Sequence, residues 1–77
     1  MSEQEWIESI SKHLVGKTIV QVAYVSEEEA KTMYWHRRPV ALRLDDGTWI
    51  TPMSDDEGND GGALTTSSEE LPIIPVL

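Results

Sequence analysis

The sequence lacks cysteine, a long apolar segment and a basic N-terminus, and each absence excludes a class of protein. Without cysteine, neither a disulfide framework nor a thiolate metal site can stabilise the fold. No apolar run approaches the roughly 20 residues needed to cross a bilayer. Residues 1–5 carry acidic side chains where a secretory signal peptide carries basic ones. These features together predict a cytoplasmic protein.

Basic residues are also scarce. The 77 residues include 14 acidic and 6 basic side chains, a formal net charge of −8. Such a surface repels nucleic-acid phosphates and anionic lipids over a Debye length of about 8 Å. We therefore expect nucleic-acid binding to be unfavourable and membrane binding to be absent. A chain of this length is expected to form one domain, residues 1–77.

Residues 2–15 have the pattern of an amphipathic helix. Ser2 and Glu5 have the spacing of an N-terminal capping box, and Gly16 suits the position that follows a helix end. One side of the helix is mostly apolar and contains Trp6, Ile7, Ile10, His13 and Leu14. We expect this side to pack on a sheet.

Residues 17–26 are rich in β-branched and apolar side chains, which predicts a central strand covered on both faces. The polar residues 27–32 predict a solvated connection, although they could form a helical turn.

A β-hairpin is the best-defined strand pair in the sequence. Residues 40–44 alternate apolar and polar side chains, and Asp45-Asp46-Gly47 is a strong turn signal. A three-residue loop with Gly47 in the left-handed conformation sets Leu42 opposite Ile50, whereas a two-residue turn sets it opposite Thr51. We prefer the longer loop because it pairs two apolar side chains.

The C-terminal part predicts short strands. Residues 62–66 can form a short strand, and residues 71–77 are apolar but contain Pro72 and Pro75, which allow only a short or irregular strand. The predicted fold class is therefore α+β. The N-terminal helix packs on a small, strongly curled antiparallel sheet or SH3-like partial barrel of 4–5 strands, as short links between sequential strands favour.

Several of these segments resemble a group of short bacterial proteins of unknown function. The likeness rests on Leu44-Asp45-Asp46-Gly47, on the later run Glu57-Gly58-Asn59-Asp60-Gly61-Gly62-Ala63-Leu64, and on Trp35 and Arg38-Pro39 between the strands. It spans nearly the whole chain after the first helix. The resemblance implies a free-standing domain and no activity.

The densest group of metal-ligand side chains lies in a glycine-rich loop after the hairpin. Its oxygen ligands are of the kind that calcium prefers, and they are Asp55, Asp56, Glu57, Asn59 and Asp60. The EF-hand pattern fails in both registers, because a required glycine or the final glutamate is missing. The loop also lacks the Lys and Ser/Thr of a phosphate-binding P-loop. A divalent-cation site remains the alternative to an exposed turn-rich connector.

A short basic and aromatic segment precedes the hairpin. Its residues are of the types enriched at protein interfaces, and they are Tyr34, Trp35, Arg37 and Arg38. No Ser, His and Asp spacing typical of a catalytic triad occurs, so we expect no enzyme and no cofactor. The favoured hypothesis is a small, non-catalytic protein-interaction module with an unidentified protein partner, either monomeric or weakly homodimeric.

Overall fold

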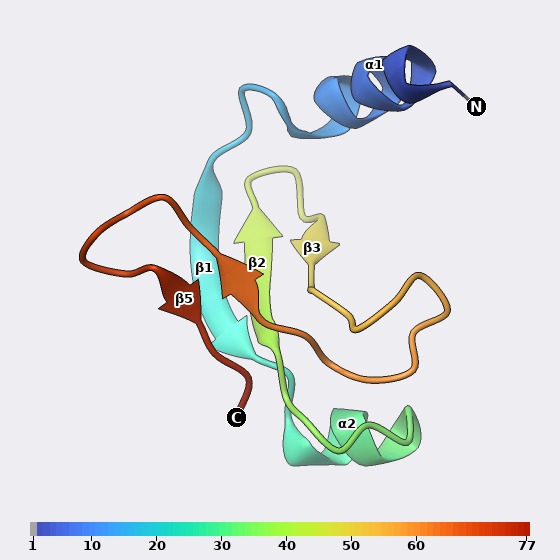
Figure 1. Cartoon of the computed structure of the whole chain (residues 1–77), viewed down its shortest axis with the longest axis vertical. Coiled ribbons are helices and arrows are strands. Elements are labelled where there is room, and N and C mark those ends of the chain that lie inside the picture. Colours follow the sequence, from blue (N-terminus) through green and yellow to red (C-terminus); the bar gives the residue numbers. More distant parts are fainter. Residues whose placement is uncertain (1) are drawn as a thin grey trace.

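The computed structural model describes residues 2–77, which form two helices and five short strands (Figure 1). The helices are α1 (Glu3–Leu14) and α2 (Glu27–Thr32). The strands are β1 (Ile19–Tyr24), β2 (Val40–Leu44), β3 (Trp49–Ile50), β4 (Leu64–Thr65) and β5 (Ile73–Ile74). Within the described residues, no helix is long and apolar enough to span a membrane.

The α+β class is confirmed, but the strands do not close into a barrel. β1, β2 and β3 form one antiparallel sheet with β2 in the centre, and β4 pairs with β5 in a separate antiparallel sheet. The tail after β5 is joined to the segment that leads into β2, because Leu77 and Arg38 exchange backbone hydrogen bonds of 2.9 and 3.0 Å. The structure thus has two small sheets, and neither the strongly curled sheet nor the SH3-like partial barrel is confirmed.

The local signals of α1 are confirmed. The Ser2 hydroxyl accepts a hydrogen bond from the Glu5 amide at 3.2 Å, and the Glu5 carboxylate accepts one from the Ser2 amide at 3.3 Å. Gly16 follows the helix with φ of +80°, a conformation that favours glycine. The helix thus begins and ends within one residue of the expected bounds, 2–15.

The expected packing of α1 on the sheet is wrong. No described residue of α1 is buried, and the four apolar side chains of its stripe are between 40% and 53% exposed: Trp6, Ile7, Ile10 and Leu14. In Figure 1 the helix extends away from both sheets. Helical periodicity predicts an apolar face, but the sequence does not specify which surface covers it.

The strand predictions were partly right. The hairpin has the expected register, with Leu42 opposite Ile50 and Gly47 at φ of +89°. The predicted central strand is instead the edge strand β1, whose residues Ile19, Val20 and Val22 are 54–63% exposed. β2 is central because its other side pairs with β3.

The core lies between α2 and the first sheet. Its buried cluster consists of Val25, Ala30 and Ala41, and the half-buried ring of Trp35 packs against it. The polar segment 27–32 is therefore a capped helix, α2, that contributes Ala30 to the core, with the Ser26 hydroxyl accepting a hydrogen bond from the Glu29 amide at 3.1 Å. Trp35 thus supports the fold rather than forming a freely exposed contact.

The position of Trp35 predicts two different costs of substitution. Trp35→Ala should lower the free energy of unfolding by about 3 kcal/mol, because it removes a large ring from the core. Trp35→Phe keeps most of the ring and loses one hydrogen bond, at a cost of about 1 kcal/mol. Urea denaturation followed by circular dichroism measures both values. Trp49→Phe, at a half-exposed ring, is the control, and a Trp35→Ala variant as stable as the wild type would contradict this packing.

Candidate functional site

The acidic loop, residues 55–60, and the segment 34–38 lie against each other. The Asp60 carboxylate joins them, because its Oδ1 atom accepts hydrogen bonds from the amides of His36 at 3.1 Å and Arg37 at 3.0 Å. The same oxygen accepts a third hydrogen bond from the Gly61 amide at 2.8 Å. A residue singled out as a metal ligand therefore positions the basic segment.

Trp35 makes the second connection between the loop and the segment. Its indole Nε1 donates a hydrogen bond of 2.8 Å to the Gly58 carbonyl, 23 residues away in sequence. The ring also contacts the core cluster that includes Ala30. The indole thus fixes the loop to the core through one polar and one apolar contact.

The close approach requires glycine at position 61. A Cβ atom on Gly61 would lie 2.5 Å from Pro39 Cδ and 2.8 Å from the Arg37 carbonyl oxygen. Both separations are shorter than real Cβ contacts allow. Gly61 and Pro39 are buried, and the Arg37 atom belongs to the backbone, so no flexible side chain can move to make room. The glycine in this loop is therefore set by backbone packing.

The remaining loop carboxylates do not converge. Asp55 closes the loop on itself by accepting hydrogen bonds from the Glu57 amide at 3.0 Å, the Asn59 amide at 3.2 Å and the Asn59 side chain at 2.6 Å. Asp56 and Glu57 are exposed. Across residues 2–77, no three acidic or histidine side chains are arranged to hold a metal ion.

The hydrogen bonds of the loop also set its electrostatics. Partial desolvation tends to raise the pKa of Asp60, but hydrogen bonds from the Arg37, Gly61 and His36 amides, with the nearby His36 ring, outweigh it and lower the pKa. The pKa of Asp55 is lowered mainly by the Asn59 side chain and amide. Both carboxylates are therefore stabilised in their charged form in the folded protein.

Helix α2 ends in a Schellman motif that places Tyr34 at the surface. The Trp35 amide donates to the Ala30 carbonyl at 2.8 Å, and the Tyr34 amide donates to the Lys31 carbonyl at 3.1 Å. Tyr34 occupies the left-handed position, with φ of +60°, where glycine is the usual residue. Its side chain is 86% exposed, so no packing within the chain explains a tyrosine here.

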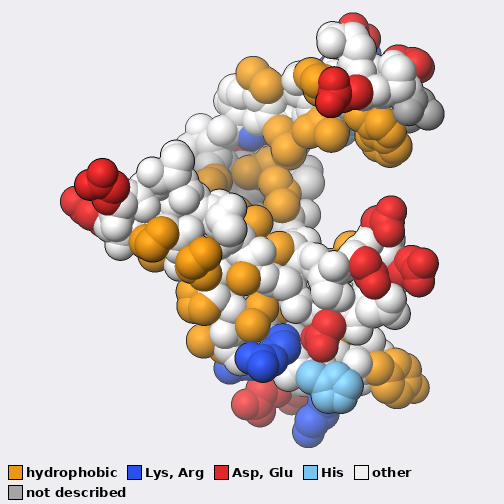
Figure 2. All heavy atoms as spheres, in the orientation of Figure 1, with side chains coloured by type: hydrophobic (Ala, Val, Ile, Leu, Met, Phe, Trp, Pro, Cys, Tyr) orange, Lys and Arg blue, Asp and Glu red, His pale blue; other side chains and the backbone are white. Residues whose placement is uncertain are grey.

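The basic corner, defined as Tyr34, His36, Arg37 and Arg38, lies beside this motif. His36 and Arg37 are exposed, and Arg38 is half-buried. Among residues 2–77, neither guanidinium group lies within 4 Å of an acidic side chain. His36 alone has an acidic neighbour, Asp60, at 3.7 Å. Figure 2 shows Lys, Arg and His side chains gathered at the end of the molecule opposite α1.

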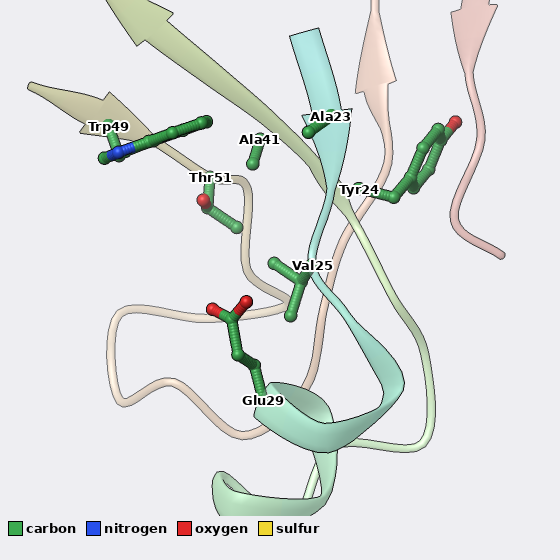
Figure 3. Close-up of a pocket in the computed structure, with 7 residues that line it drawn as sticks. All are labelled: Ala23, Tyr24, Val25, Glu29, Ala41, Trp49 and Thr51. Carbon is green, nitrogen blue, oxygen red and sulfur yellow. The ribbon is translucent and has the colours of Figure 1, made fainter.

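A shallow hollow of about 410 Å³, which the sequence did not predict, lies on the first sheet. Figure 3 shows its lining residues, among them Val25, Ala41, Trp49 and the Glu29 carboxylate. Glu29 and Tyr24 are the titratable residues of this lining, and Glu29 also accepts a hydrogen bond from the Ser26 hydroxyl at 3.1 Å. One carboxylate engaged in helix capping does not form the acid–base pair that most hydrolytic chemistry requires.

The fold and the surface define the chain as a small α+β domain with a fixed basic corner. Comparisons with models of known protein families, with curated proteins and with solved structures gave no match.

The lowered pKa of Asp60 predicts that the contribution of its carboxylate to stability depends on pH. A carboxylate whose pKa is lower in the folded state contributes stability above its unfolded pKa, and that contribution is lost as the pH falls through the folded value. Asp60→Asn should therefore melt at a lower temperature than the wild type at pH 7. The difference should shrink as the pH falls from about 5 to about 3.

Thermal melts followed by circular dichroism measure this difference. Asp56→Asn is the matched control, because it removes the same charge from the same loop at an exposed residue. Equal melting temperatures for Asp60→Asn and Asp56→Asn at pH 7 would show that the hydrogen bonds of Asp60 contribute nothing to the stability of the fold.

Proposed function

We propose that this protein is a small, non-catalytic interaction module of the cytoplasm, and that the basic corner binds an acidic segment of a protein partner. One observation carries the proposal. Tyr34 is almost fully exposed in a left-handed conformation, and the arginines beside it have no acidic partner within the described chain.

The conformation of Tyr34 has a cost that the fold itself does not require. A non-glycine residue in the left-handed region costs about 1–2 kcal/mol, and such residues cluster at functional sites. Glycine would satisfy the end of α2 without that cost. The side chain of Tyr34 therefore makes its contribution outside the chain.

The corner is also suited to binding because its backbone is already ordered. The amides of His36 and Arg37 are held by Asp60, and the adjacent Trp35 is held by Gly58. An interface that is ordered before association loses less conformational entropy on binding. Tyrosine and arginine are also the side chains that contribute most often to interface hot spots.

The charge of the whole chain restricts the partner. At a net charge of −8, a large acidic surface is repelled at long range, whereas a short acidic segment can reach the corner within a Debye length of about 8 Å. The same charge disfavours an extended nucleic-acid backbone. A short acidic peptide segment is therefore the best-suited ligand.

A divalent-cation site in loop 55–60 is the alternative function, and it has less support. A bound cation would compete with the three amides that donate to Asp60 Oδ1 and with the donors to both oxygens of Asp55. Displacing them from Asp60 would also release the basic corner from the loop.

Selection from a phage-displayed library of random peptides tests the proposed function. Wild-type protein should enrich peptides rich in Asp and Glu, and their affinity should fall about tenfold or more in Arg37→Glu. The affinity should also weaken with rising salt, because the contact is between opposite charges. Lys12→Glu, which makes the same charge change on the distant helix α1, is the matched control.

Tyr34→Gly tests whether the tyrosine ring contributes to peptide binding without disturbing the fold. Glycine suits the left-handed position, so this variant should be at least as stable as the wild type and should still bind the selected peptides more weakly. Enrichment of peptides without acidic residues, or binding that survives both Arg37→Glu and Tyr34→Gly, would contradict the proposal.

A further inference from the structure

The apolar stripe of α1 (Trp6, Ile7, Ile10 and Leu14) has no cover within its own chain. Figure 2 shows hydrophobic side chains along α1 on the side that faces a hollow between the helix and the rest of the molecule. A free helix of 12 residues is marginally stable in water, and most helical stability in proteins comes from packing of the apolar face. An exposed stripe of this kind indicates a missing partner surface.

The connection between α1 and β1 has defined contacts at the helix end and with the β2–β3 turn. At the helix end, the Val15 amide donates to the Ser11 carbonyl at 2.9 Å and the Lys17 amide donates to the Leu14 carbonyl at 3.2 Å. The Lys17 ammonium group also lies 3.3 Å from the Asp46 carboxylate on the β2–β3 turn.

The exposed area is large enough for a stable interface. The described chain exposes 6028 Å², whereas a compact monomer of 8.7 kDa is expected to expose about 4,700 Å². The excess is about 1,300 Å², and a standard protein interface covers about 800 Å² of each partner. An interface of standard size would cover more than half of this excess, and the exposed stripe of α1 contributes to it.

We propose that the missing cover is a second copy of this chain, and that two copies clasp each other through their α1 helices. Each copy offers both a protruding apolar helix and a hollow beside it. In a two-fold symmetric dimer, the α1 of each copy fills the hollow of the other, so both surfaces are covered by one arrangement. A different protein would have to supply both an apolar element that fills the hollow and a surface that covers α1.

The exposed apolar residues near the base of α1 extend the clasp surface. Val15, Ile19 and Val20 are all more than half exposed and continue from the helix end into β1. The helix of the second copy can therefore contact the α1 stripe and the start of β1 together. This surface is separate from the basic corner, so the dimer does not rest on the proposed peptide binding.

Charge gives the dimer a characteristic salt dependence. Both copies carry a net charge of −8, and the polar side of α1 contributes Glu5 and Glu8. Salt screens this repulsion between copies and strengthens apolar contact, so the dimer should tighten as salt rises. Binding of an acidic peptide at the basic corner should respond in the opposite direction.

Sedimentation equilibrium tests the clasp directly. Wild-type protein should change from 8.7 kDa to about 17 kDa between about 10 μM and about 1 mM, with a lower dissociation constant at higher salt. Ile10→Lys places a charge in the stripe and should raise the dissociation constant at least tenfold. Gln4→Lys makes the same charge change on the polar side of α1 and should leave the dimer intact.

Two further measurements distinguish the loss of the dimer from a loss of fold and locate the interface at α1. An unchanged NMR signal from the Trp35 indole proton in Ile10→Lys shows that the sheet remains folded. The chain has no cysteine, so a spin label on Gln4→Cys gives one label per molecule, and any dipolar coupling between labels must arise between copies.

A constant mass of 8.7 kDa over the whole concentration range would overturn the clasp, with α1 then either free or closed on its own sheet. A dimer that persists in Ile10→Lys would place the interface elsewhere and overturn the role of α1. Neither result affects the peptide selection at the basic corner. The two proposals therefore fail independently.

Discussion

The Asp60 carboxylate accepts hydrogen bonds from three backbone amides, and the arrangement of the lower half of the molecule depends on this contact. It holds the acidic loop against the segment that leads from α2 into β2. The indole of Trp35 and the close approach of Gly61 to Pro39 act at the same junction. Together these contacts determine where the chain enters the central strand and how the end of α2 is presented.

This junction explains why a loop with the composition of a metal site serves the backbone. A carboxylate that accepts three amide hydrogen bonds is charge-stabilised without a cation, and its lowered pKa has the same origin. Asp55 is likewise occupied by donors of its own loop. The loop is acidic in composition, but each of these two carboxylates has a hydrogen-bonding role of its own.

The sequence predicted the features that depend on local rules. The capping box at Ser2 and Glu5 and the register of the hairpin around Gly47 follow from spacing within a few residues, and both are confirmed. The α+β class followed from the same patterns. The contacts of Asp60 and Trp35 join residues 23 or 24 positions apart, and no local pattern specifies such pairs.

Two expectations failed because a pattern shows that a face is apolar and not what covers it. The stripe of α1 was assigned to its own sheet, and β1 was assigned to the centre of a sheet; both surfaces are exposed. The Schellman motif at Tyr34 was also missed, because its usual glycine signal is absent. The unusual residue at that position is what makes the basic corner a candidate interaction surface.

Hydrogen exchange followed by NMR tests the junction at Asp60 most directly. We predict slow exchange at the amides of His36, Arg37 and Gly61 and at the indole of Trp35, because all four protons are held in hydrogen bonds. In Asp60→Asn the same protons should exchange faster as a group, while those of the β1–β2 ladder stay protected. Exchange at the rate of an unstructured loop in the wild-type protein would contradict this role of Asp60.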